Sequence, residues 1–164
     1  MSQPLNFRTM TIDDLPVILR IEHKNFPNPW PEKTLRGCLE ANYQCVIGFY
    51  DTQPKEVVCY AVLMIGFEES NLLNISVNPD FQQEGIGRRL MEHLLLISRI
   101  NQAKNMWLEV RASNTPAIRL YQKLGFDQIG QRDNYYRYHD AEGKPVSEHA
   151  ILMSRAVVMP VNKP

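Results

Sequence analysis

The sequence contains 164 residues, 44% hydrophobic and 22% charged, and this balance predicts a single globular domain over residues 1–164. Its 18 basic and 18 acidic residues cancel, which argues against a strong overall attraction to nucleic acid or to a membrane surface. The sequence shows neither a run of about 18 apolar residues nor a basic-then-apolar leader, so we expect a cytoplasmic protein without a membrane span.

Cysteine and histidine usage predicts neither disulfides nor a metal site. Three cysteines are an odd number, and their spacings match no zinc motif: Cys38, Cys45 and Cys59. We therefore expect reduced thiols that pack as small apolar side chains. The histidines lack nearby partners for a metal or a catalytic triad: His23, His93, His139 and His149.

Hydrophobic periodicity and turn residues predict four helices and seven strands. The first helix begins at Thr11 and Asp14, spaced like a capping box, and runs to about Phe26. The other helices are expected at Pro31–Glu40, Gln83–Asn101 and Asn114–Leu124. The strands are expected at Leu5–Met10, Gln44–Tyr50, Glu56–Phe67, Asn71–Val77, Met106–Arg111, Phe126–Tyr138 and His149–Val158.

The order of these segments predicts an α/β fold with a mixed sheet. Three strands between Gln44 and Val77 follow one another through short connections, which suggests an antiparallel meander. The strand–helix–strand unit that follows implies one parallel pair in the middle of the sheet.

The stretch Val77–Arg88 is a candidate phosphate site. A strand ends there, a loop carries Gly85 and Gly87, and the longest helix begins. The first N–H groups of a helix lack internal partners, its dipole makes that end positive, and glycine allows close approach of a ligand. A phosphate or pyrophosphate could bind there, although two glycines beside a helix start are also ordinary turn chemistry. The dinucleotide fingerprint is excluded because Leu90 occupies the place of its third glycine, and no P-loop lysine motif is present.

Two motifs resemble the GNAT acetyltransferase superfamily. The pattern Gln82-x-x-Gly85-x-Gly87 resembles its motif A. More specifically, Asn114–Phe126 is similar to the superfamily pattern Asn-x-x-Ala-x-x-Leu-Tyr-x-x-x-Gly-Phe. Leu108–Asn114 and Arg132–Tyr136 most resemble the RimI family of ribosomal-protein-alanine N-acetyltransferases. The resemblance covers about residues 74–136.

This resemblance implies a GNAT fold, with a central, mostly antiparallel mixed sheet of about six to seven strands flanked by four helices. It implies acetyl-CoA as cosubstrate, no metal, and an amine as acceptor. The backbone of Ile75, Ser76 and Val77 would bind the pantetheine arm, and Asn114 would contact it, cap the following helix, or do both. The pyrophosphate would bind at Gln83, Glu84, Gly85, Ile86, Gly87 and Arg88.

The resemblance also implies two catalytic residues. Acyl transfer needs a neutral amine, and Glu109 lies on a predicted strand whose neighbours Leu108 and Val110 face the opposite side. Its carboxylate could take the proton of the amine, directly or through water. Tyr121 would protonate the departing thiolate, since a phenol with a pKa of about 10 stays protonated at neutral pH. The alternatives are a strand glutamate that is solvated or salt-bridged, for example to Arg111, and a core tyrosine.

The acceptor is predicted less directly. An α-amine has a pKa of about 7.7–8.0 against about 10.4 for lysine, so it is the easier group to present neutral. Together with the resemblance, this favours the N-terminal alanine of a small-subunit ribosomal protein. A lysine, a polyamine or another small amine remains an alternative, as does a CoA-binding module without activity. Substrate contacts are expected from Trp30, Tyr135, Tyr136 and Tyr138, each of which could instead be a packing residue.

Two features near these aromatic residues leave the acceptor open. Arg132 and Asp133 could form a simple surface pair instead of contacting a substrate. The segment Tyr138–Ser147 is expected to form a loop longer than that of close family members.

Overall fold

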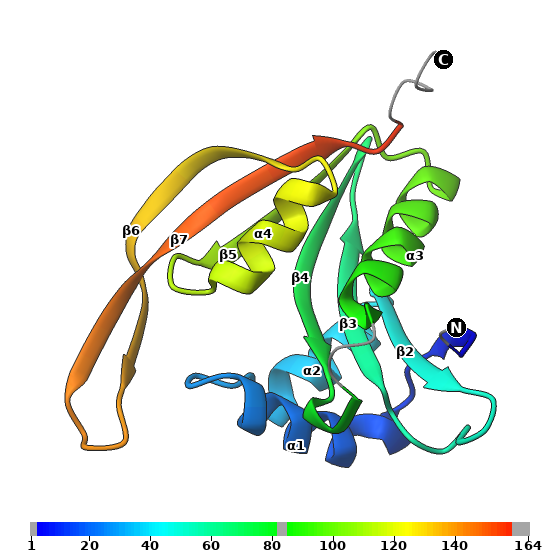
Figure 1. Cartoon of the computed structure of the whole chain (residues 1–164), viewed down its shortest axis with the longest axis horizontal. Helices are drawn as coiled ribbons and strands as arrows, with labels where there is room; N and C mark the ends of the chain where they lie inside the picture. Colours follow the sequence, from blue (N-terminus) through cyan, green and yellow to red (C-terminus); the bar gives the residue numbers. More distant parts are fainter. Residues whose placement is uncertain (1–2, 82–84, 159–164) are drawn as a thin grey trace.

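The computed structural model describes residues 3–81 and 85–158, which build one seven-stranded sheet in the order β1-β2-β3-β4-β5-β7-β6 (Figure 1). The strands are β1 (Leu5–Thr9), β2 (Gln44–Tyr50), β3 (Cys59–Ile65), β4 (Glu69–Val77), β5 (Asn105–Arg111), β6 (Asp127–His139) and β7 (Pro145–Ala156). The α-helices are α1 (Leu15–Asn25), α2 (Glu32–Glu40), α3 (Ile86–Ile100) and α4 (Thr115–Lys123), with short 3₁₀ turns η1 (Ile12–Asp14) and η2 (Pro79–Phe81).

Strand pairing confirms the predicted mixed sheet. The pair β4–β5, which α3 connects, is parallel, and the other neighbouring strands of the described chain pair antiparallel. Because a parallel pair needs a crossover, α3 is carried onto one face of the sheet.

Helices cover both faces of the sheet, and β3 contributes to both cores. Ala61 and Leu63 face one core with Leu90 and Leu94 of α3. The alternate residues Tyr60 and Val62 face the other core, which α1 and α2 complete. This alternation explains why β3 is apolar throughout: a strand buried on both faces has no polar side.

Most predicted elements are confirmed within a few residues, and the largest difference concerns the last two strands. The prediction of a long loop at Tyr138–Ser147 is wrong, because β6 extends to His139 and β7 begins at Pro145, four residues before the expected His149. The exposed, polar residues of this hairpin carry no apolar alternation that would have marked them as strand. Figure 1 shows the β6–β7 hairpin extending beyond the other strands and bending.

Local contacts also agree with the sequence. Asp14 accepts the backbone N–H of Thr11 at 2.8 Å, as expected of the helix start, and forms an ion pair with Arg8 at 2.7 Å. The cysteines are unpaired and buried, as predicted: Cys38, Cys45 and Cys59. In the described part of the chain, the helices are too short or too polar to cross a membrane.

Candidate active site

A cleft opens where β4 and β5 diverge. The two strands pair only from Glu69 to Leu72 on β4 and from Asn105 to Leu108 on β5. A bulge opposite Val62 and Leu63 of β3 puts Leu73 out of register at the point of divergence. The cavity of about 480 Å³ lies between Ile75–Val77 on one wall and Glu109–Arg111 on the other. Backbone groups of β4 beyond Leu72 therefore face the cavity, where β5 would otherwise bond to them.

The predicted phosphate loop approaches this cleft at the start of α3. Gly85 has a φ of 66°, the left-handed conformation that favours glycine, and α3 begins directly after it. Gly87 lines the cleft, and a Cβ there would lie 3.2 Å from Cδ2 of Leu120 in α4. Ile86 is buried, so only its backbone could contact a ligand. Gln82, Gln83 and Glu84 lie outside the described residues.

Arg88 is directed toward its own helix. Its Nε lies 3.0 Å from Oε1 of Glu92, one turn later, and its side chain is 60% exposed. This pairing is that of a solvated helix residue, one of the alternatives for Arg88, and the binding of phosphate at this helix start stays a prediction.

Glu109 lines the cleft with its carboxylate near the hairpin. On β5, Met106, Leu108 and Val110 are buried in the core, which places Glu109 and Arg111 on the opposite face, as the alternation predicts. The Glu109 side chain is 30% exposed, and its Oε1 lies 3.2 Å from Nε of Arg132.

Both surface pairs considered from the sequence are wrong. Arg111 lies 3.7 Å from Glu148 rather than beside Glu109. Arg132 pairs with Glu109, while Asp133 accepts a hydrogen bond from Gln131. The sequence spacing favoured near neighbours, whereas β6 and β7 bring these partners from the end of the chain.

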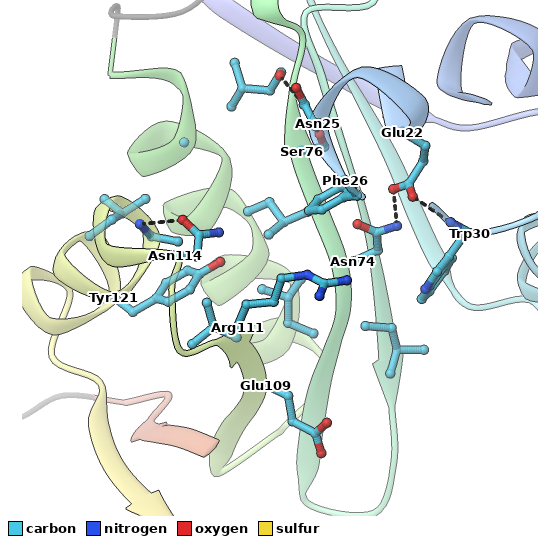
Figure 2. Close-up of a pocket in the computed structure, with 18 of the residues that line it drawn as sticks. Glu22, Asn25, Phe26, Trp30, Asn74, Ser76, Glu109, Arg111, Asn114 and Tyr121 are labelled. Carbon is cyan, nitrogen blue, oxygen red and sulfur yellow. Dashed lines mark hydrogen bonds between the residues drawn. The ribbon is translucent and has the colours of Figure 1, made fainter. Parts of the chain in front are cut away.

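Tyr121 on α4 also lines the cleft, opposite β4 (Figure 2). Its side chain is 5% exposed and packs edge-on against Phe126, with ring centroids 5.8 Å apart. Burial, together with the nearby Tyr136, raises the pKa of its phenol above the ordinary value. The residue is therefore part of the core and of the cleft wall at once.

The location of Asn114 fits both roles that were considered for it. Its Oδ1 accepts the backbone N–H of Ala117 at 3.3 Å, which makes it the N-cap of α4. It also lines the cleft, so capping and ligand contact are compatible.

Of the four predicted acceptor residues, two line the cleft and two, Tyr135 and Tyr138, do not. Trp30 and Tyr136 line the cavity. Tyr135 is 49% exposed, lies outside the cavity lining and packs edge-on against Tyr136. Tyr138 contacts the Arg111 guanidinium, with 5.2 Å between the guanidinium carbon and the ring centroid.

Sequence reasoning missed a buried carboxylate at this end of the cleft. Glu22 of α1 is 1% exposed, and its Oε1 accepts from the Tyr60 hydroxyl at 2.6 Å and from Asn74 Nδ2. Its Oε2 accepts the backbone N–H of Trp30 at 2.9 Å. The available signal was its position four residues after Ile18, on the buried face of the helix. Burial and the neighbouring carboxylate raise the pKa of Tyr60.

A second missed residue, Asn25, joins the end of α1 to the wall of the cleft that β4 forms. Its Nδ2 donates to the hydroxyl of Ser76 and to the carbonyl of Val77, the latter at 2.8 Å (Figure 2). These bonds fix β4 where it no longer pairs with β5.

Comparison with known proteins decides the family. The model of the GNAT acetyltransferase family matches residues 15–126. The [ribosomal protein bS18]-alanine N-acetyltransferase of Escherichia coli K12 is 38% identical over 146 residues, covering 89% of this chain and 93% of the relative. The chain belongs to the GNAT acetyltransferase family. The Salmonella typhimurium enzyme of the same name is 37% identical over 150 residues, covering 92% of this chain and 96% of the relative.

A solved structure confirms the GNAT fold. The crystal structure of the Escherichia coli ribosomal-protein-S18-alanine N-acetyltransferase matches with a TM-score of 0.82 and 32% identity, covering 98% of this chain and 99% of that chain. As a GNAT enzyme, the protein transfers an acyl group from acetyl-CoA.

The cleft fits this cosubstrate. An open strand edge suits an arm that hydrogen-bonds through amide groups, and a glycine-rich helix start suits its phosphates. The described residues contain no cluster of three or more side chains that could hold a metal ion.

Replacing Gly85 by alanine should weaken acetyl-CoA binding. The added Cβ meets no atom within 4 Å, but the φ of 66° becomes strained, by about 1–2 kcal/mol. Relief of that strain would move the cradle backbone, and we expect an affinity loss of about tenfold in calorimetric titration.

Gly143 supplies the matched control, because it has a φ of 79° at the tip of the β6–β7 hairpin. Gly143→Ala should be strained to a similar degree and bind acetyl-CoA as the unmodified protein does. Equal affinities for the two variants would contradict the cradle at Gly85.

Proposed function

We propose that this enzyme acetylates the N-terminal α-amine of a protein, namely the N-terminal alanine of a small-subunit ribosomal protein. The observation that carries the proposal is the 38% identity to a bS18-alanine N-acetyltransferase over 89% of this chain and 93% of that enzyme. Likeness over nearly the whole length includes the elements at the acceptor end of the cleft, where Trp30 and Tyr136 lie.

The chemistry of the acceptor supports an α-amine. Only the neutral amine has a free lone pair. The pKa of a lysine side chain is about 2.5 units higher than that of an α-amine, so lysine is harder to deprotonate. That gap corresponds to roughly 3 kcal/mol at neutral pH. A single partly exposed carboxylate, Glu109, is therefore better suited to activating an α-amine than a lysine side chain.

We propose Glu109 as the general base of direct transfer. Its carboxylate takes the proton from the amine, directly or through a water molecule, as the nitrogen bonds to the acetyl carbon. Backbone N–H groups on the free edge of β4 stabilise the negative charge that develops on the thioester oxygen. Arg132 is half exposed, so its ion pair with Glu109 is weak and an incoming amine can displace it.

We propose Tyr121 as the general acid. As the carbon–sulfur bond breaks, its hydroxyl gives a proton to the CoA thiolate. The raised pKa keeps this phenol protonated through the neutral and mildly alkaline range, so the donor is present whenever the acceptor is neutral.

An acceptor assay tests the proposed activity. Peptides that begin with alanine and have a free N-terminus should be acetylated, whereas the same peptides with a blocked N-terminus and free lysines should not. Mass spectrometry identifies the modified nitrogen. Acetylation of the blocked set alone would refute the α-amine assignment.

Glu109→Gln should slow transfer to α-amines about 10²- to 10⁴-fold, because an amide cannot accept the proton. The defect should shrink as the pH rises above about 8, because hydroxide can then take the proton of the attacking amine in place of the carboxylate. Steady-state kinetics from pH 6 to 10 measures both effects. Glu69→Gln, an exposed position on β4, is the control and should retain normal rates; an undiminished rate in Glu109→Gln would remove the base assignment.

Tyr121→Phe should lower kcat by about 10²-fold with little change in acetyl-CoA affinity, since the ring packing on Phe126 is kept while the proton is lost. In the unmodified enzyme, kcat should not fall between pH 7 and 9.5 through loss of this proton, because its pKa is raised. Tyr43→Phe, a half-buried residue that packs against the core on the other face of the sheet, is the control. Turnover equal to that of this control would leave Tyr121 as a packing residue.

A further inference from the structure

The guanidinium of Arg111 lies inside the cleft, against two aromatic rings of the β6–β7 hairpin. The residue lies two positions after Glu109 on the same face of β5, and its side chain is 13% exposed. The guanidinium carbon lies 4.2 Å from the ring centroid of Tyr136 and 5.2 Å from that of Tyr138, both on the hairpin. Figure 2 shows the guanidinium extending from β5 toward β4, the strand that carries Asn74.

One nitrogen of this guanidinium has an unused hydrogen-bonding capacity. Nη1 is buried and has no hydrogen-bond acceptor among the described residues. The carboxylate beside it is Glu148, whose Oε2 is 3.7 Å away and whose Oε1 accepts the backbone N–H of Ser113 at 2.7 Å. A buried donor without an acceptor is costly and uncommon in a folded protein. It is tolerated where a ligand supplies the missing oxygen.

We propose that Nη1 of Arg111 binds the carbonyl oxygen of the acceptor's first peptide group, and this inference rests on the proposed α-amine acceptor. The two side chains leave β5 about 6.6 Å apart and on one face, so they can flank one residue of an extended peptide. The amine would then lie at Glu109 and the carbonyl of the same residue at Arg111. Arg111 is in this view a specificity residue for a peptide N-terminus.

The charges around Arg111 favour a neutral carbonyl over other groups. Glu148 already offsets the guanidinium, which weakens the attraction for the free carboxylate of an amino acid. Simple alkylamines and the side-chain amine of lysine have no carbonyl at this distance from the nitrogen, so they cannot satisfy Nη1.

The test compares two acceptors that differ only at the first peptide group. One is an alanine-initiated peptide, and the other is the same peptide with its first amide replaced by an (E)-alkene, which keeps the extended shape but has neither the carbonyl oxygen nor the N–H. In the unmodified enzyme, kcat/KM should favour the amide about 10- to 100-fold. In Arg111→Met, this preference for the amide should be about tenfold or more smaller than in the unmodified enzyme, mainly through loss of activity on the amide.

Controls separate this effect from misfolding and from loss of charge. Arg137→Met removes a cation from the same hairpin, outside the lining of the cleft, and should keep the full preference. If Arg111→Met does not fold, Arg111→Lys replaces it in the test. Lysine retains the charge but not the planar fork of the guanidinium, so this variant should give a preference between those of the unmodified enzyme and of a full loss. Acetyl-CoA affinity should be unchanged in all three.

The outcomes distinguish the inference from the proposed function. If the unmodified enzyme acetylates the peptide but prefers the amide equally with and without Arg111, the inference is refuted and the α-amine activity stands. If it acetylates lysine side chains and no α-amine, both are refuted. A preference that falls only in the Arg111 variants supports the inference.

Discussion

The candidate active site depends on the fact that the hydrogen-bonded pairing of β4 and β5 stops before the two strands end. In a complete parallel pair, the backbone groups of the two strands would satisfy each other and no ligand could reach them. Here the ladder ends at Leu72 and Leu108, both buried in the core, which holds the strands together below the cleft. The bulge at Leu73 then directs β4 away. The sheet thus supplies free hydrogen-bonding groups without losing its continuity.

An opened sheet needs other contacts to keep its edges in place, and two polar residues of α1 provide them. Asn25 donates hydrogen bonds to Ser76 and Val77 on the wall of the cleft that β4 forms. Glu22 joins α1 to β3, to β4 and to the segment before α2 through three hydrogen bonds. A buried carboxylate is stable only with such partners, so this cluster restricts the acceptor end to one arrangement.

The features predicted most accurately from the sequence are those that depend on residues close together in the chain. Strand alternation was sufficient to place Glu109 on the face opposite its apolar neighbours, which belong to the core, whereas its role in a site was implied by the family resemblance. The cap at Asn114 follows from a local rule of the same kind. Glu22 could not be assigned in this way, since its partner Tyr60 is 38 residues away and belongs to another element. The hairpin pairs were missed because solvent-facing strands need no apolar pattern, and their partners are set by register alone.

The two ends of the cleft are built from different parts of the molecule. The proposed cofactor end belongs to β4, α3 and α4, whose side chains also form the main core. The proposed acceptor end includes Tyr136 and Arg132 of a hairpin that projects beyond that core (Figure 1). Substitutions in the projecting hairpin should therefore disturb folding less than substitutions at the other end, where the side chains belong to the core. On this architecture, the hairpin end of the cleft can vary among related enzymes at lower cost to the fold than the end that the core forms.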